Sequence, residues 1–297
     1  LYRRLLQIFG LEVLFMEMLV FGIAAAVSYW YETEVFLFFG CVYVMCRFLY
    51  KWYIPLVESW PPERGKTGRW ILGCLPPISF VIILFVLLTM ASYDVVGIWV
   101  VFYIVMGYAW LRGGVYMLEC LDLSWPFDAV YLDNKAAVFP AAGGFVGITL
   151  IYAGANTGDG PCWWVVLFAA GLGLVAWLGL ALLINVSVRI SERVSVDRDV
   201  GSGIRFGAYL TASSMILASV QATLLEFTIG WPVLPLMLFF LLAEWFYIQP
   251  SHSLVDDGPR VDLLPSILLG CVYLSYASIV LLFFHRISER VSGRVFL

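Results

Sequence analysis

Long apolar segments separated by short polar stretches run along the whole chain. A helix of roughly 20 apolar residues spans the hydrocarbon core of a bilayer, which is about 30 Å thick. Nine segments reach that length, at 8–31, 35–57, 70–92, 95–118, 136–154, 162–188, 204–228, 231–249 and 263–285. Their apolar runs are uninterrupted, unlike the alternating ten-residue strands of an outer-membrane barrel. The pattern therefore predicts an all-α fold, a polytopic membrane bundle.

The connections leave no room for a soluble domain, since the longest polar stretches are about 58–69, 119–135, 189–203 and 250–262. We expect one membrane domain over 1–297, with an N-terminal three-helix region (1–94), a four-helix unit (95–228) and a C-terminal helical hairpin (229–297). The first segment follows two arginines, but two glutamates interrupt it and no convincing cleavage site follows. We expect it to remain as a helix rather than to be removed as a signal peptide.

The distribution of basic residues predicts the orientation, because short loops rich in Lys and Arg stay in the cytoplasm. With nine crossings, 14 of the 17 Lys and Arg residues fall on one side, and only Arg286, Arg290 and Arg294 fall on the other. This count places the N-terminus in the cytoplasm.

The three C-terminal arginines fit that orientation poorly. Residues 286–292 repeat the sequence of residues 189–195, Arg-Ile-Ser-Glu-Arg-Val-Ser, which the same count places in the cytoplasm. The tail would also be cytoplasmic if segment 231–249, which contains Pro232, Pro235 and Glu244, entered and left the membrane on one side. Such re-entrant backbone needs cover from protein or water. Eight crossings plus a re-entrant hairpin therefore remain an alternative to nine.

A weak internal repeat appears at an offset of 65 residues, between 133–138 and 198–203. Each copy places a side chain that can cap a helix, Asn134 or Asp199, directly before a run of small residues. One crossing separates the two helices, so they should run in the same direction. The pattern predicts a parallel helix-hairpin repeat.

Small residues continue along both helices of this repeat at helical spacing. In lipid, apolar burial does not drive helices together, so close backbone approach along small residues supplies much of the packing energy. We expect the two helices to cross closely and the sixth segment to add its own small residues, Ala169, Gly173 and Ala176, to the same core. The packing glycines expected are Gly143, Gly147, Gly173, Gly203 and Gly207.

At these residues the sequence resembles the bacterial inner-membrane family called Domain of Unknown Function 350. The matching motifs are Asp122-Leu123-Ser124-Trp125-Pro126-Phe127-Asp128, then Asn134-Lys135-Ala136-Ala137, then Ala142-Gly143-Gly144-Phe145-Val146-Gly147, with a looser second copy in Asp199-Val200-Gly201-Ser202. Asp199 stands where the family usually has Asn, and Pro140 interrupts an alanine-rich turn. The resemblance covers roughly 95–228 and implies a bacterial cytoplasmic (inner) membrane setting and a helix-repeat architecture, but no mechanism.

Ionisable residues at membrane depth are costly and are candidates for function. The candidates for an ion or anion pathway are Glu12, Glu17, Arg47, Asn134, Asp199, Arg205 and Glu244. For Arg47 we favour a buried pair with Glu12 or Glu17, with a proton or ion relay or snorkelling at the lipid interface as the alternatives.

For Glu244 we favour snorkelling or pairing at the interface, or a protein-lined cavity if its segment is re-entrant. For Asn134 and Asp199 we favour helix capping within a cytoplasmic cluster of loop-to-loop ion pairs, with anion binding at the helix N-termini as the alternative.

Composition supports the membrane assignment: 62% of residues are apolar, 13% are charged and the mean hydropathy is +0.93. The net charge of −4 argues against a nucleic-acid partner. Two histidines and six cysteines without a Cys-x-x-Cys motif give no reason to expect a metal or another cofactor.

These features predict a non-enzymatic integral membrane subunit, a structural or accessory component of a larger assembly. Its expected partners are the lipid bilayer and other membrane subunits or further copies of the chain. A channel or transporter that uses the intramembrane carboxylates is the alternative.

Overall fold

The computed structural model describes residues 33–58, 66–92, 95–157, 162–220, 232–251 and 263–295, and every regular element in these ranges is a helix. The long helices are α2 (Thr33–Glu58), α3 (Lys66–Thr89), α4 (Ile98–Met117), α5 (Lys135–Ala155), α6 (Trp163–Val188), α8 (Val200–Val220), α9 (Val233–Ser251) and α10 (Leu263–Val295). Six of the described helices are long and apolar enough to cross a membrane, as expected for a multi-pass membrane protein.

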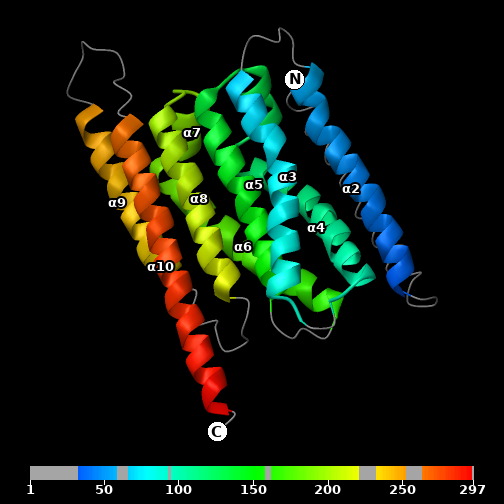
Figure 1. Ribbon diagram of the computed structural model, residues 1–297. Coiled ribbons are helices and arrows are strands. Elements are labelled where there is room, and N and C mark those ends of the chain that lie inside the picture. The colour runs from blue at the N-terminus through cyan, green and yellow to red at the C-terminus, as the bar shows by residue number, and fades with distance from the viewer. Residues whose placement is uncertain are drawn as a thin grey trace.

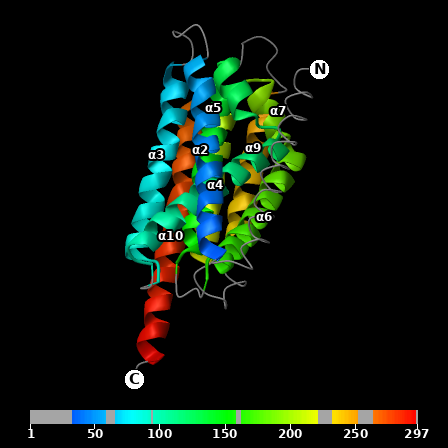
Figure 2. The same cartoon turned by 90° about the vertical axis from the view of Figure 1, so that its right-hand side faces the viewer.

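Each predicted apolar segment after the first overlaps one of these helices, while the first segment, 8–31, and residues 221–228 of the seventh lie outside the described residues. The helices form one elongated bundle in which α5 lies at the centre and α8 packs along it (Figures 1 and 2). On one flank, α9 and α10 lie beside α8, and on the other, α2 lies beside α4. Helix α10 continues well past the ends of its neighbours (Figure 1).

Two of the polar stretches between the apolar segments contain short helices. The 3₁₀ turn η1 (Leu118–Leu121) and the π-helical turn η2 (Trp125–Tyr131) lie between α4 and α5, and α7 (Ile190–Ser195) lies between α6 and α8. In α7, Ile190 and Val194 lie one turn apart and are both completely buried, so this turn packs on the bundle like a longer amphipathic helix.

The turns that lead into α5 and α8 share the same local geometry. Asp133 and Arg198 both have a positive φ, 49° and 55°. The next residues, Asn134 and Asp199, each donate their backbone N–H to the carbonyl six residues earlier, at 3.0 Å in both cases. The side chain of each accepts a hydrogen bond from the N–H two residues later, at 3.0 and 2.9 Å. Both helices therefore begin with a side-chain cap in the same type of turn.

Helices α5 and α8 make backbone contact along glycines. A Cβ on Gly143 would lie 2.2 Å from the carbonyl oxygen of Gly207, and a Cβ on Gly207 would lie 2.4 Å from that of Phe139. Further along, a Cβ on Gly154 would lie 2.4 Å from the carbonyl oxygen of Ala218. The residue numbers rise together in both helices, so the two run parallel. No side chain larger than hydrogen fits at these contacts.

Gly203 makes a similar contact beside a proline. Pro140 has no N–H to donate to the carbonyl of Ala136, one turn earlier. A Cβ on Gly203 would lie 2.2 Å from that same oxygen, so the Cα hydrogens of this glycine face it. Gly147 also lies in this interface, where a Cβ would lie 2.8 Å from the ring of Trp177.

Gly173 does not belong to this close packing. It is only half-buried, as is Ala169, and Ala176 is exposed. Helix α6 instead buries a stripe of larger residues that includes Leu174 and Trp177, so the expected small-residue face of the sixth segment is wrong. Trp177 fills the space above Gly147 and donates its Nε1 to the carbonyl of Leu210, and this large side chain determines which face of α6 turns inward.

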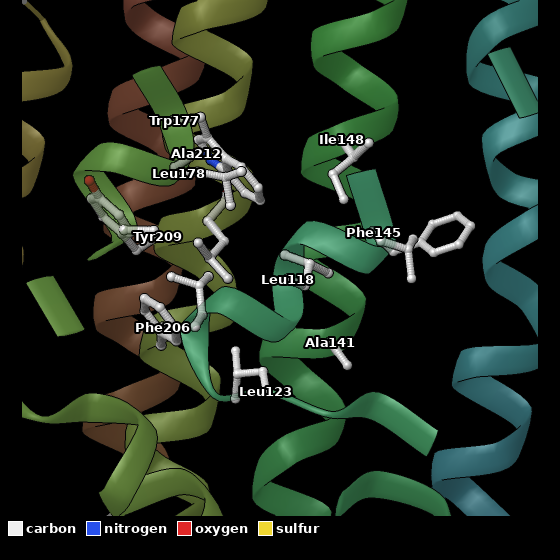
Figure 3. Close-up of a cluster of buried hydrophobic side chains, with 14 of the residues drawn as sticks. Leu118, Leu123, Ala141, Phe145, Ile148, Trp177, Leu178, Phe206, Tyr209 and Ala212 are labelled. Carbon is white, nitrogen blue, oxygen red and sulfur yellow. The ribbon is translucent and has the colours of Figure 1, made fainter. Parts of the chain in front are cut away.

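The core around these helices is built from aromatic and aliphatic side chains (Figure 3). Phe145 and Ile148 of α5 are completely buried, and Leu118 packs beside the α5 backbone, where a Cβ on Gly144 would lie 2.9 Å from it. On the other side of α5, the Phe145 ring lies 4.6 Å from the ring of Trp52. The core is therefore continuous from α2 to α8.

Two consecutive prolines interrupt the hydrogen bonds of α3, and side chains from α2 replace them. Pro76 and Pro77 cannot donate to the carbonyls of Leu72 and Gly73, four residues earlier. Trp52 donates its Nε1 to the Leu72 carbonyl at 3.0 Å, and Tyr53 donates its hydroxyl to the Gly73 carbonyl, also at 3.0 Å. Lipid offers no hydrogen bond to such carbonyls, so these two bonds join α2 to α3 at a defined register.

We expect Gly207→Ala to destabilise the bundle by about 1–3 kcal/mol, because its Cβ would overlap the backbone of α5 and neither helix can move without losing the other contacts. The matched control is Gly179→Ala in α6, where a Cβ would meet nothing within 4 Å. Unfolding of purified protein by titrating a denaturing detergent, followed by circular dichroism, measures both. Equal stability of the two variants would contradict the close α5–α8 contact.

We expect Trp52→Phe to cost roughly 1–3 kcal/mol, because it leaves the buried carbonyl of Leu72 without a donor. Trp164→Phe, on an exposed part of α6, is the control for loss of an indole. Adding Pro76→Ala to Trp52→Phe supplies a backbone N–H for the same carbonyl and should restore part of the lost stability. Thermal unfolding midpoints of the four proteins test this, and a loss that Pro76→Ala leaves unchanged would assign the effect to packing alone.

Candidate functional site

A set of interacting charged side chains lies where α7, α8, α9 and α10 meet at one end of the bundle (Figure 1). We call it the charge cluster, and it consists of Arg193, Asp199, Ser202, Arg205, Glu244 and Ser266. Arg205 lies in the second turn of α8, and Ser266 lies in the first turn of α10. All four helices therefore contribute near their ends, at the level where the apolar part of the bundle stops.

Glu244 is the centre of the cluster. Its side chain is 0% exposed, although it lies on an otherwise apolar helix. One carboxylate oxygen accepts a hydrogen bond from Nε of Arg205, and the other accepts from Nη2 of Arg205 at 3.0 Å and from Nη1 of Arg193. Arg205 is itself only 2% exposed. A planar guanidinium that binds a carboxylate through two nitrogens is the strongest geometry for such a pair.

Asp199 provides the second carboxylate. Its Oδ2 accepts a hydrogen bond from the Ser202 hydroxyl at 2.5 Å and from Nη2 of Arg193 at 3.2 Å, while its Oδ1 caps α8. Burial raises the pKa of this carboxyl, but the Ser202 hydrogen bond and the charges of Arg193 and Arg205 together hold the pKa below its ordinary value. Asp199 is therefore ionised at neutral pH and occupies the N–H groups at the start of α8.

Serine hydroxyls complete the environment of Arg205. Its Nη1 donates to Ser266 of α10 at 2.6 Å and its Nη2 donates to Ser202 at 3.0 Å. Gly201 leaves room for this arrangement, since a Cβ there would lie 2.8 Å from the Ser266 hydroxyl and 3.2 Å from Nη1 of Arg205. The small residue at 201 thus lets α10 approach the arginine.

The cluster is electrically balanced, with two arginines and two carboxylates. Removing charges from water is costly, and the cost is recovered only where each charge is paired and its remaining hydrogen-bonding positions are used. Glu244 and Arg205 meet that condition through partners from α7, α8 and α10. The arrangement can therefore hold four helices together in a region where an unpaired charge would be costly to bury.

Comparisons with protein-family models, with curated proteins and with solved structures found no match to this chain. The resemblance to the Domain of Unknown Function 350 family therefore stays a prediction, based on the motifs in 95–228.

The structure brings together three of the predicted pathway residues, Asp199, Arg205 and Glu244. Asn134 lies beside them but binds backbone rather than charges: this side chain is 2% exposed, caps α5 and donates its Nδ2 to the carbonyl of Val194, the residue after Arg193, at 2.8 Å. Arg47 lies on α2 with its guanidinium 6.0 Å from the Tyr43 ring. Glu12 and Glu17 lie outside the described residues, so the expected pair between Arg47 and either of them stays a prediction.

Glu244, for which snorkelling or pairing at the interface was expected, is completely buried and pairs with arginines of α7 and α8. Its depth in the membrane stays a prediction. Arg193 and Ser266 were not among the predicted site residues, and the apolar spacing of Ile190 and Val194 is the signal in the sequence that α7 docks and brings Arg193 to the bundle.

Potential metal ligands do not gather here. Within the described ranges, His, Cys, Asp and Glu side chains form no group of three or more that could hold a metal ion. Cys41, a buried thiol, lies in the separate core around α2 and α4.

We expect Glu244→Gln to lower the free energy of unfolding by about 3–5 kcal/mol, because it leaves the buried guanidinium of Arg205 without its counter-charge. Glu192→Gln removes a carboxylate whose pair with Arg189 is highly exposed, and should change stability by less than about 1 kcal/mol.

The double variant Arg205→Met with Glu244→Met should be more stable than Glu244→Gln, because no unpaired charge remains buried. Denaturing-detergent titrations of the four proteins measure the differences. If Glu244→Gln and Glu192→Gln have equal stability, the charge cluster does not hold the helices.

Proposed function

We propose that this protein is a non-enzymatic integral membrane subunit, a structural or accessory component of a larger membrane assembly that contains other subunits or further copies of the chain. The observation that carries the proposal is Glu244, the carboxylate that a transport mechanism would be expected to use. It is completely buried and is neutralised within the bundle by Arg205 and Arg193. A carboxylate bound in this way holds helices together and is not free to exchange with a solute.

The outer surface of the bundle supports the same proposal. Large apolar side chains face outward along several helices, such as Phe39 on α2, Phe168 and Val186 on α6, and Leu264 on α10, each at least 65% exposed. Lipid or the helices of another subunit would cover these faces. The close glycine contacts between α5 and α8 supply a rigid centre for the bundle. The helices around that centre can contact other subunits on several sides.

For the topology we propose nine crossings of a bacterial inner membrane, with the N-terminus in the cytoplasm. Helix α9 has no internal break, which supports a crossing, although its apolar part, Val233–Phe246, is shorter than the six helices that reach spanning length. The end of the bundle that carries Arg189, Arg193 and Arg198 would face the cytoplasm. The end of α10 would then face the opposite side.

We also propose that α5 and α8 descend from a parallel helix-hairpin duplication. The matching turns before the two helices support it, with the same backbone hydrogen bond and the same cap at an offset of 65 residues. Membership of the Domain of Unknown Function 350 family would account for this repeat.

A channel or transporter is the second candidate. The observation that favours it is the Arg205–Glu244 pair itself, since ionisable side chains buried among membrane helices often mark a pathway for ions or protons. Together with Glu12, Glu17 and Arg47, such a pair could take part in exchange if the helices around it moved apart.

Two measurements on one purified sample separate these functions. The full chain is extracted in mild detergent to determine subunit composition by native mass spectrometry, and it is reconstituted into liposomes for proton, sodium, potassium and chloride flux. We expect a stoichiometric partner or a homo-oligomer, and flux no greater than in empty liposomes. Flux that Glu244→Gln abolishes and Glu192→Gln preserves, with both variants folded, would establish the transporter and refute the accessory role.

A further inference from the structure

Helix α10 runs parallel to α8. A Cβ on Gly201, at the start of α8, would lie 2.8 Å from the Ser266 hydroxyl in the first turn of α10. Further along, a Cβ on Gly270 would lie 3.2 Å from the Cβ of Ala208. The residue numbers rise together in both helices, so both begin at the same end of the bundle (Figure 1). Helix α9 lies between them in sequence and returns the chain to that end.

The charges on either side of α10 oppose this direction. Residues 250–262, before the helix, contain one arginine, whereas residues 284–297, after its apolar part, contain three. Because the more basic flank of a membrane helix stays in the cytoplasm, the charge rule alone would place the end of α10 there. In the proposed topology this end faces the opposite side. A contact within the bundle must therefore outweigh the flanking charges.

The direction of α10 depends on the insertion of α9, and α9 inserts poorly by itself. Its apolar part, Val233–Phe246, is shorter than the six helices that reach spanning length, and it contains Glu244. An ionised carboxylate in a short apolar segment opposes the transfer of that segment into lipid. If α9 stayed out of the membrane, α10 would cross in the opposite direction and the charge rule would be satisfied.

Arg205 provides the counter-charge that α9 needs. It lies on α8, which precedes α9 in the chain, and its guanidinium binds both carboxylate oxygens of Glu244. The same guanidinium donates to Ser266 of α10 at 2.6 Å. An arginine near a helix end can extend its charge toward the interface, so α8 can insert before Glu244 is present.

Arg193 is less suited to this role. It lies in α7, outside the long apolar helices, and its side chain is 19% exposed. It also divides its hydrogen bonds between Glu244 and Asp199. Arg193 therefore completes the charge cluster, while Arg205 supplies the paired contact on the helix that inserts first.

We propose that Arg205 determines the membrane orientation of the C-terminal hairpin, α9 and α10. Once α8 has inserted, Arg205 neutralises Glu244, and α9 inserts against α8. Helix α10 then crosses in the direction of α8, against its own flanking charges. The inference rests on the nine crossings proposed above and goes beyond the accessory function, which does not specify how the last two helices enter the membrane.

The test fuses a reporter of location to the end of the full chain, expressed in a bacterial inner membrane. Alkaline phosphatase is active only outside the cytoplasm, and green fluorescent protein is fluorescent only inside it. The ratio of the two signals, each measured on the full-length fusion, reports where the end of α10 lies. We expect the wild-type ratio to place it outside.

Arg205→Met should lower this ratio at least about tenfold, because α9 then lacks its counter-charge and stays out of the membrane. The matched control is Arg189→Met, which removes one basic charge from the same end of the bundle, where the pair with Glu192 is highly exposed. The charge rule treats the two arginines alike, so a change of less than about twofold in the control separates pairing from charge count.

Two further variants separate insertion from the stability of the folded bundle. Glu244→Met breaks the same ion pair and leaves Arg205 without its carboxylate, but it removes the charge from α9. The end of α10 should therefore stay outside, although the bundle is less stable. For the same reason, adding Glu244→Met to Arg205→Met should restore the ratio to within about threefold of the wild-type value.

An unchanged ratio in Arg205→Met would overturn the inference and leave the nine crossings intact. Equal falls in Arg205→Met and Glu244→Met would also overturn it, because lost folding would then explain both. The same holds for equal falls in Arg205→Met and Arg189→Met, and for a double variant that restores nothing. A wild-type ratio that places the end of α10 in the cytoplasm would refute the inference and the nine crossings together, without bearing on the accessory function.

Discussion

Hydrocarbon forms no hydrogen bonds, so every polar group inside the bilayer must find its partner within the bundle. This constraint links features of the structure that have little in common in sequence. The carbonyls exposed by Pro76 and Pro77 are bound by Trp52 and Tyr53 of the preceding helix. The carbonyls on the inner side of α5 face glycines of α8. Glu244 and Arg205 bind each other. In each case the group that would be costly in lipid specifies which helix lies next to it.

The glycine contacts and the charge cluster depend on the same helix. Helix α8 touches α5 through Gly203 and Gly207 on one side, and it carries Arg205 on the turn between them. Because these glycines bring the backbones into contact, the register of α8 against α5 is narrowly defined. That register places Arg205 at the level of Glu244 and Ser266. A shift of α8 would therefore weaken both the backbone contacts and the ion pair.

The sequence predicts the helices far better than the contacts between them. Apolar length alone locates the described long helices, because the bilayer thickness sets a minimum that few other structures meet. The glycines of α5 and α8 were also identifiable, since small residues at helical spacing have a direct role in packing. Gly173 shows the limit of that rule, because a neighbouring Trp177 determined the inward face of α6. Spacing identifies which faces could pack, but side-chain volume decides between them.

The candidate site was predictable only in part, for a related reason. Asp199, Arg205 and Glu244 are conspicuous as charges in apolar surroundings, but their pairing depends on three-dimensional contacts between segments about 40 residues apart. Arg193 lies in a polar stretch dense in charges of both signs, so ion pairing was expected there but the partners of this arginine could not be read from the sequence. Its role follows from the docking of α7 through Ile190 and Val194, which turns an ordinary surface arginine into a partner for two carboxylates. A short amphipathic turn can thus set the chemistry of a membrane site.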